Sequence, residues 1–340
     1  MFSYNKQPEP QTLYIIRNSS GIEAAFTPHG AKLVYLKVPG KDGKSINIVQ
    51  DLDVLEQCAQ LSDSCSTSVI DYYKDLKLND EYFHLTTNSS LKIIHPEKNS
   101  FPSKIRKIIL TRVRTITFIY KSQGEGHEFS DNLTVMIKYT IDDSNKLKIE
   151  HNVTTDQPIV FNIPNHIFFN LNGQESGSIG HHLLLISADH YMPIDSSLIP
   201  TGEIAIAKGT PFDFTKPTAI GIRINDNNTQ LKNGKGYDHN FVLKVHNRKT
   251  PVAKVIGDKS GILMEVFTEQ PGLHFYTGNF EKSKYSIYGG VKSNFRTGFY
   301  LAPQDLPDSG TQLAFPLTAL RPKENYSRTV IYRFTSDFNN

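Results

Sequence analysis

Apolar and polar residues alternate with a period of two along most of the chain. The stretch KLVYLKV (residues 32–38) alternates in this way, and TITFIYKS (residues 115–122) does the same. Because successive side chains of a β-strand point to opposite faces, the pattern predicts strands with one buried face. Further stretches of this kind are HLLLISADHYM, HNFVLKVH, PVAKVIG, GILMEVFTE, GLHFYTG and RTVIYRF. An apolar period of 3.6 is rarely sustained, so the chain is predicted to be all-β.

The clearest hairpin joins LTVMIKYTI (residues 133–141) to KLKIEHNVTT (residues 146–155) through the four residues DDSN. Asp, Ser and Asn favour turns because their short side chains bond to the nearby backbone. Short strands separated by Gly, Asn and Pro predict a large antiparallel β-sandwich. A helix is indicated only around residues 52–61, and the polar stretch NDNNTQLKNGKG (residues 225–236) is predicted to be a loop.

No linker or low-complexity segment divides the chain, so residues 1–340 are predicted to form a single domain with its core at about residues 21–334. The 37 Lys and Arg nearly balance the 34 Asp and Glu, which argues against a nucleic-acid partner. No stretch approaches 18 consecutive apolar residues, so no membrane span is expected. The opening MFSYNKQPEPQT has no apolar signal core, and a cytoplasmic location is predicted.

Cysteines and metal-binding spacings contribute little. Cys58 and Cys65 are too few for a disulfide framework; they could bridge each other, but two thiols are the preferred interpretation. His181 and His182 are adjacent, so in a strand their side chains would point to opposite faces. No Cys-x-x-Cys or EF-hand spacing, phosphate loop or dinucleotide fingerprint occurs. We therefore predict neither a metal nor a cofactor.

The stretch FNIPNHIFFNL (residues 161–171) places His166 between Asn165 and Asn170 in an aromatic strand. One interpretation is a core histidine bonded to a neighbouring carbonyl. The other is a reactive histidine presented from a stiff support, with the asparagines holding the local backbone. Buried polar groups need hydrogen-bond partners, so the flanking asparagines weaken the first interpretation, and both stay open.

Two further stretches combine polar and aromatic residues at strand ends. In GKGYDHNFVL (residues 234–243), Asp238 follows a glycine-rich turn; it either caps the turn or accepts hydrogen bonds from ligand hydroxyls. In GLHFYTGNF (residues 272–280), Phe275 and Tyr276 either pack in the core or form a platform for the apolar face of a sugar ring.

The stretch GFYLAPQDLPDS (residues 298–309) is an apolar strand that ends in a loop. Such ends often carry binding or catalytic groups. Ala302 occupies the position that would first reach a pocket, and Gln304 is the polar side chain best placed to contact a ligand. The nearest carboxylates are Asp305 and Asp308.

Taken in order, these stretches resemble the aldose 1-epimerases (galactose mutarotases). NHIFFNL is similar to their NHxYFNL, GYDHNFVL to xxDHNFxL, and GLHFYTGNF to GLQxYTGN. The early stretch FTPHGAKLVYLKVPGKDGKSINIVQDLD and the late stretch FPLTALRPKENYSRTVIYRF also resemble the family. The resemblance runs from about residue 21 to residue 334.

The resemblance implies a large antiparallel β-sandwich with a sugar bound on one sheet. It also implies a cofactor-free reaction that opens and recloses the pyranose ring of a hexose such as galactose or glucose. His166 would protonate the ring oxygen, His95 would be the second histidine, and Asp238 would bind sugar hydroxyls. Further substrate contacts would come from Asn165, Tyr276 and Gln304. The assembly would be a monomer or a dimer.

The chain departs from the family pattern at two places. The family glutamate in xxxEPQxxPDA, which acts as the base, falls on Ala302 of FYLAPQDLPDS. The family stretch GRxANRI corresponds to CSTSVIDYYKDLKL, which has no arginine. Two interpretations follow: an active epimerase, with Asp305 as a substitute base acting through a water, or a catalytically impaired sugar-binding or regulatory relative.

Overall fold

The computed structural model describes residues 13–50, 113–121, 133–156, 163–279, 295–306 and 320–336, with the side chain of His29 excepted. It also describes the backbone of several short strands outside these ranges. The predicted helix at residues 52–61 lies outside the described residues, as do Cys58 and Cys65.

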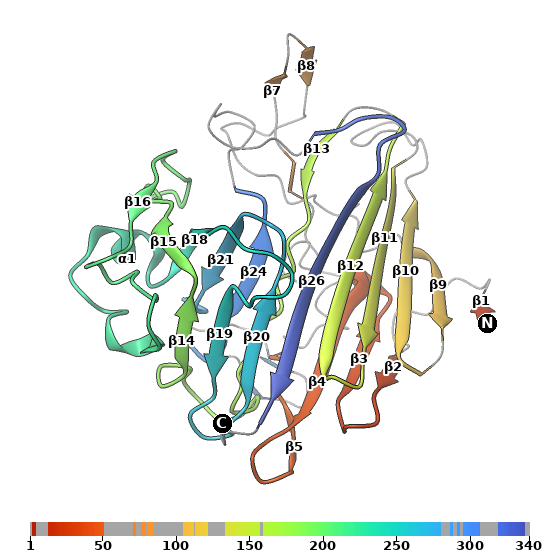
Figure 1. Ribbon diagram of the computed structural model, residues 1–340, viewed down its shortest axis with the longest axis horizontal. Helices are drawn as coiled ribbons and strands as arrows, with labels where there is room; N and C mark the ends of the chain where they lie inside the picture. The colour runs from red at the N-terminus through yellow and green to blue at the C-terminus, as the bar shows by residue number, and fades with distance from the viewer. Residues whose placement is uncertain are drawn as a thin grey trace.

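The front layer in Figure 1 is a ten-stranded sheet in which all pairings are antiparallel. Its strands, in spatial order, are β1 (Phe2–Tyr4), β9 (Ile105–Thr111), β10 (Thr115–Lys121), β11 (Thr134–Ile141), β12 (Lys146–Thr154), β26 (Tyr326–Thr335), β20 (Leu263–Phe267), β19 (Ala253–Ile256), β14 (Leu183–Ile186) and β17 (Thr218–Ala219).

Two smaller sheets lie behind it (Figure 1). The five-stranded sheet contains β16 (Ala205–Ile206), β15 (Ala188–Tyr191), β18 (Asp238–Leu243), β21 (Gly272–Tyr276) and β24 (Tyr300–Gln304). The four-stranded sheet contains β2 (Tyr14–Arg17), β3 (Glu23–Thr27), β4 (Lys32–Pro39) and β5 (Ser45–Asn47). Shorter pairings are β25 (Ala319–Leu320), β13 (Ile159–Asn162) and β6 (Asp71–Tyr72) in one sheet, β22 (Ser286–Ile287) with β23 (Val291–Lys292), and β7 (Leu76–Leu78) with β8 (Glu81–Phe83).

One cluster of buried apolar side chains joins these layers, from Ile16 near the N-terminus to Phe334 in the last strand. The buried Tyr332 of β26 donates its hydroxyl to the carbonyl of Leu301 in β24, at 2.9 Å. Tyr139 of β11 donates to the carbonyl of Ala31, also at 2.9 Å. Sheet therefore packs on sheet around a shared core, and the predicted antiparallel sandwich is confirmed.

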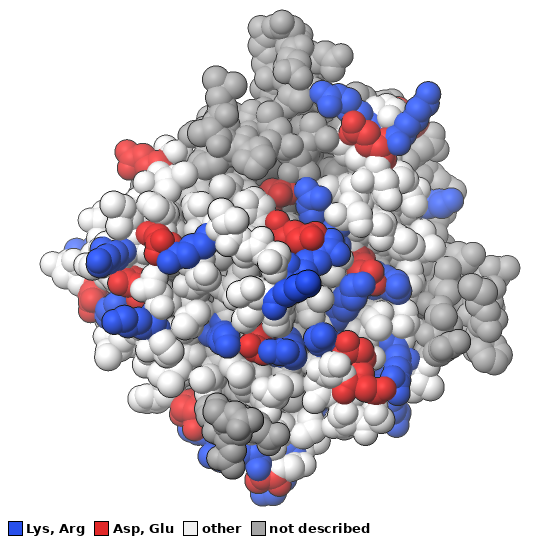
Figure 2. Space-filling view, viewed as in Figure 1, with Lys and Arg blue, Asp and Glu red and all other residues white. Residues whose placement is uncertain are grey.

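The outer face of the ten-stranded sheet carries opposite charges side by side (Figure 2). The largely buried Glu265 lies between Lys254, at 3.2 Å, and Arg333, which contacts it with two nitrogens. Glu150 lies 3.1 Å from Lys138 and 2.7 Å from Lys148. Polar residues outside and apolar residues inside produce the period-two pattern of these strands.

The predicted hairpin at residues 133–155 is confirmed. Strand β11 pairs with β12 from Thr134 opposite Thr154 to Ile141 opposite Leu147, and both strands alternate in burial. The side chain of Asp142 accepts from the backbone of Ser144, as expected of an Asx turn.

Two sequence predictions need correction. The stretch HLLLISADHYM is not one strand: it breaks at Ser187, so that β14 joins the ten-stranded sheet and β15 the five-stranded sheet. The loop at residues 225–236 contains a short helix, α1 (Thr229–Gly234), capped by the Asn228 side chain. Two single 3₁₀ turns, η1 (His29–Ala31) and η3 (Ile220–Ile222), complete the helices of the described residues. Among these residues no helix is long and apolar enough to cross a membrane.

Candidate functional site

Strands β18, β21 and β24 present one polar face on the side of their sheet away from the core. The register places Asn240 opposite His274, and His274 opposite Ala302. Residues paired in this way point to the same face, as do residues two apart along a strand. We call this the site face; its residues are Asp238, Asn240, His274, Tyr276, Tyr300, Ala302 and Gln304.

The alternate residues of the same strands face the core. Phe275 is fully buried, stacked on Tyr237 at 5.3 Å and in edge contact with Phe214 at 5.7 Å. Of the two aromatic residues considered for a sugar platform, Phe275 is thus a core residue. Tyr276 lies on the site face.

Asp238, His274 and Tyr300 form a chain of polar contacts across the three strands. Nε2 of His274 lies 2.8 Å from Oδ1 of Asp238, and Nδ1 lies 3.4 Å from the Tyr300 hydroxyl. The two side chains of the ion pair are 18% and 19% exposed, so both remain accessible to a ligand. A neutral imidazole that donates from Nε2 to the carboxylate carries its lone pair on Nδ1.

His166 belongs to a separate segment and packs against this series of polar contacts. Its ring stacks on the Tyr300 ring, with centroids 4.6 Å apart and planes 22° apart. It also makes an edge contact with the ring of His274, at 6.3 Å. Two imidazoles and a carboxylate from three segments thus meet around one tyrosine.

Backbone hydrogen bonds place the His166 segment beside β24. Phe169 and Phe299 exchange two of them, at 2.7 and 3.0 Å, next to Tyr300. Gln50 donates its backbone N–H to the carbonyl of Phe168, at 2.8 Å. The predicted role of Asn170 in holding the backbone is confirmed, because its amide donates to the carbonyls of Gly177 and Thr297, both at 2.9 Å.

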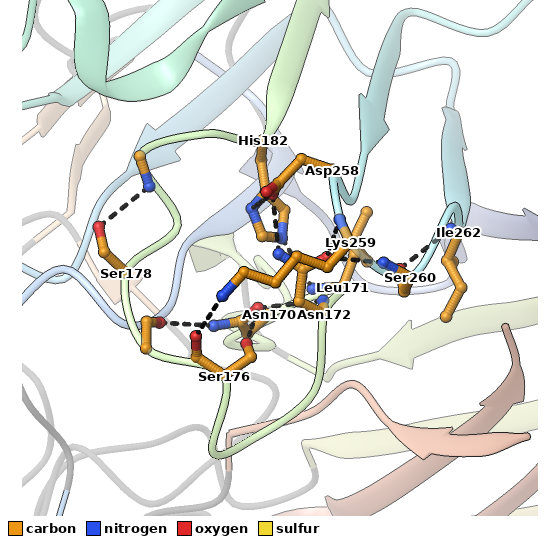
Figure 3. A network of polar contacts seen from close by, with 12 residues as sticks. Asn170, Leu171, Asn172, Ser176, Ser178, His182, Asp258, Lys259, Ser260 and Ile262 are labelled. Atoms are coloured by element: carbon orange, nitrogen blue, oxygen red, sulfur yellow. Dashed lines mark hydrogen bonds and ion pairs between the residues drawn. The ribbon is translucent and has the colours of Figure 1, made fainter.

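A network of polar contacts fixes the loop that follows this segment (Figure 3). Asn172 donates to Asp258 at 2.8 Å and accepts from the backbone of Lys259 and Ser260. The buried His182 accepts from the backbone of Leu171 at 3.0 Å. The network ties the loop to the turn between β19 and β20, and it makes the support of His166 rigid.

His239 orients the backbone at Asp238 from the core side. Its Nδ1 accepts from the Asp238 backbone N–H, and its Nε2 lies 3.1 Å from Oε1 of Gln230 in α1. Burial lowers the pKa of His239 to about 3, and His274 adds to this effect. His239 is therefore neutral near neutral pH and serves as a fixed support.

The glycine-rich turn before Asp238 depends on Gly236. Its φ is +141°, and a Cβ built there would lie 2.3 Å from Oδ1 of Asn279. Asn279 cannot move freely, because its amide donates to the carbonyls of Gly234 and Tyr237, both at 2.9 Å.

Gly236→Ala is expected to lower the free energy of unfolding by about 2–4 kcal/mol, since backbone strain and overpacking combine. Urea unfolding measures the loss. The control is Gly209→Ala, whose φ is +78° but whose added Cβ meets nothing within 4 Å, so that only the strain applies. Equal losses in the two variants would contradict the role of the Asn279 contact.

Ala302 is fully buried on the site face, in a cluster with Tyr276 and Tyr300 against which Phe168 packs. Gln304, two residues further along β24, donates its amide to Oδ1 of Asn240. The structure thus brings the Ala302 and Gln304 positions onto the same face as Asp238.

Asp305 follows the end of β24 and is largely buried. Burial raises the pKa of Tyr326 in β26, and the nearby charge of Asp305 raises it further. Asp305 is therefore close to Tyr326, the first residue of β26.

Tyr276 and Asn165 are both buried. Burial and the charge of Asp238 raise the pKa of Tyr276, and its hydroxyl accepts from the backbone of Asn279 at 3.1 Å. The side chain of Asn165 is hydrogen-bonded to the buried His151 of β12, which directs it into the core. His95 and most of the arginine-free stretch at residues 65–78 lie outside the described residues.

Sequence reasoning passed over His274 and Asn240, although both stand in the stretches it quoted. The strand period was the available signal. Asp238 and Asn240 are two residues apart and point to one face of their strand, and the same is true of His274 and Tyr276. What was missing was the pairing between β18 and β21, because two strands that are distant in the sequence do not reveal their register.

Comparisons with known proteins match most of the chain to one family. The profile of the aldose 1-epimerase family matches residues 102–333. A galactose mutarotase from Homo sapiens is 35% identical over 262 residues, covering 76% of this chain and 74% of that protein. An aldose 1-epimerase from Escherichia coli K12 is 28% identical over 344 residues, covering 97% and 96%.

Solved structures share the fold. An aldose epimerase homologue from C. elegans matches with a TM-score of 0.80 at 23% identity, covering 95% of this chain and 98% of that one. A galactose 1-epimerase from Lactobacillus acidophilus matches with a TM-score of 0.78 at 23% identity, covering 98% of both.

Proposed function

Since the chain belongs to the aldose 1-epimerase family, we propose that it interconverts the α and β anomers of a free aldose, with hexoses such as galactose or glucose as substrates. The main support is the meeting of His166 with Asp238 and His274 on one accessible face. These groups come from segments far apart in the sequence, and local strand packing does not require them to converge.

Anomer exchange needs an acid at the ring oxygen and a base at the anomeric hydroxyl. Both oxygens are bonded to the same carbon, so acid and base must lie within roughly 8 Å, two hydrogen bonds and one O–C–O bridge. His166 supplies the proton to the ring oxygen. Its ring is held by Tyr300, and 6.3 Å separates it from the next imidazole.

Asp238 binds sugar hydroxyls. Its Oδ1 is taken by His274, whereas its Oδ2 makes no hydrogen bond within the part of the chain that the structure describes, so the second oxygen serves the ligand. The amides of Asn240 and Gln304 line the same face, while Asn165 positions the His166 segment from the core. The departure at Ala302 also fits a sugar-binding relative without catalysis, and the experiment separates the two.

Polarimetry of freshly dissolved α-galactose and α-glucose tests the proposal. The protein is expected to accelerate mutarotation above the buffer rate, and His166→Asn is expected to lower kcat/KM by about a hundredfold or more. Calorimetric titration with the same sugars provides the second readout. Saturable binding without acceleration would assign the protein to the non-catalytic relatives. If the protein neither bound these sugars nor accelerated their mutarotation, a sugar ligand would be rejected.

A further inference from the structure

His274 stands at the centre of the site face, with partners on both ring nitrogens. Asp238 lies 2.8 Å from Nε2 and fixes the tautomer with the proton on that nitrogen. The Tyr300 hydroxyl is 3.4 Å from Nδ1, a long contact that a substrate hydroxyl can replace. The basic lone pair of His274 therefore points to the side where His166 stacks on Tyr300.

The register relates His274 directly to Ala302. These two residues are paired across β21 and β24, so their Cβ atoms lie about 4.5–5.5 Å apart and point to the same face. The chain has histidine where the quoted motif GLQxYTGN has glutamine, and alanine where xxxEPQxxPDA has glutamate. The differences from the motifs at positions 274 and 302 thus fall in one cross-strand pair, and the first introduces a proton acceptor beside the place where the second removes one.

The geometry points to His274 as the general base of this protein, with Asp238 as its positioning partner. This assignment rests on the proposed anomer exchange. Nδ1 takes the proton of the anomeric hydroxyl, the electron pair of that O–H bond forms the carbonyl, and the bond from C1 to the ring oxygen breaks. The ring oxygen receives a proton from His166. Reclosure on the other face of C1 returns both protons, so the cycle needs no further reactant.

Asp238 contributes by charge as well as by orientation. When His274 is protonated, the carboxylate at Nε2 stabilises the imidazolium, as in other carboxylate–histidine pairs. A neutral amide at position 274 would keep a hydrogen bond to Asp238 but could not take a proton. That difference separates the chemical role of His274 from a structural one.

The test compares kcat/KM for mutarotation and sugar affinity in wild type and His274→Gln. We expect kcat/KM to fall 10²–10⁴-fold, while the calorimetric Kd for galactose changes far less. The wild-type pH profile should show an acid limb, with the rate falling tenfold per unit as the base becomes protonated, and the residual rate of His274→Gln should lack it. The control is His181→Gln at an exposed position in another loop, with no expected change.

If His274→Gln lowers the melting temperature sharply, His274→Ala provides the second variant, and added imidazole should restore part of its rate. Wild-type acceleration that survives His274→Gln would overturn the assignment and leave the proposed function intact. The assignment would also be overturned, with the proposed function intact, if His274→Ala lost its rate and imidazole did not restore it. If the wild-type protein bound sugar but did not accelerate mutarotation between pH 5 and pH 9, the assignment of His274 and the proposed anomer exchange would both be overturned.

Discussion

Ala302→Glu, introduced into the His274→Gln protein, is expected to raise kcat/KM for mutarotation at least tenfold, with 10²–10⁴-fold as the ceiling for a positioned base. The reason is geometric: position 302 is paired with position 274, so the new carboxylate enters the region that the imidazole has left. The gain stays below the ceiling because no surrounding groups are arranged to orient the carboxylate.

The same substitution has a structural cost. Ala302 is fully buried between Tyr276 and Tyr300, so the added atoms overpack the cluster and lower the free energy of unfolding by about 1–3 kcal/mol. Ala302→Gln is the matched control, since it has the same size and no basic group. An equal gain in the glutamine variant would show that shape, and not proton transfer, is responsible.

Asp305→Asn tests whether Asp305, the remaining candidate, is the general base. Since the Asp305 charge acts on Tyr326 of the opposite sheet, we expect its replacement to leave kcat/KM unchanged. If Asp305→Asn abolished the wild-type rate while Ala302→Glu had no effect, the base would be Asp305.

The protein is expected to lose about 5 kcal/mol of stability between pH 6.5 and pH 5, because three histidines are buried in the neutral form. Burial lowers the pKa of His151 and His182 to about 4 and that of His239 to about 3, from an ordinary 6.5. Below pH 6.5 the unfolded chain binds protons at these positions and the folded chain does not, so stability falls as the pH falls. Over this interval each group costs about 1.6 kcal/mol.

Urea unfolding at several pH values measures this slope, which should reach about 4 kcal/mol per pH unit. His182→Asn should reduce the slope by about one third, whatever its effect on stability at pH 7. The exposed neighbour His181 is the matched control, and His181→Asn should leave the slope unchanged. A flat dependence between pH 6.5 and pH 5 would show that these imidazoles take up protons in the folded state.

The sequence by itself determined the strands and several candidate residues. Period-two alternation located the hairpin of β11 and β12, because one face of each strand is buried and this requirement is local. His166 and Asp238 became candidates on local grounds too: His166 stands between two asparagines inside an aromatic stretch, and Asp238 follows a glycine-rich turn just ahead of an alternating strand. The predicted support from Asn170 was local in part: one of its bonds is to Gly177 of its own loop, and the other is to the distant Thr297.

Only the tertiary structure decided which strands are neighbours. The break at Ser187 sends the two halves of one apolar stretch into different sheets, although alternation continues through it. The pairing of β18, β21 and β24 sets Asn240, His274 and Ala302 in one row, and the same alternation turns Phe275 into the core. A one-residue shift in that pairing would reverse every one of these positions. Register between distant strands is fixed by the packing of the whole core, and the sequence around each residue does not contain that information.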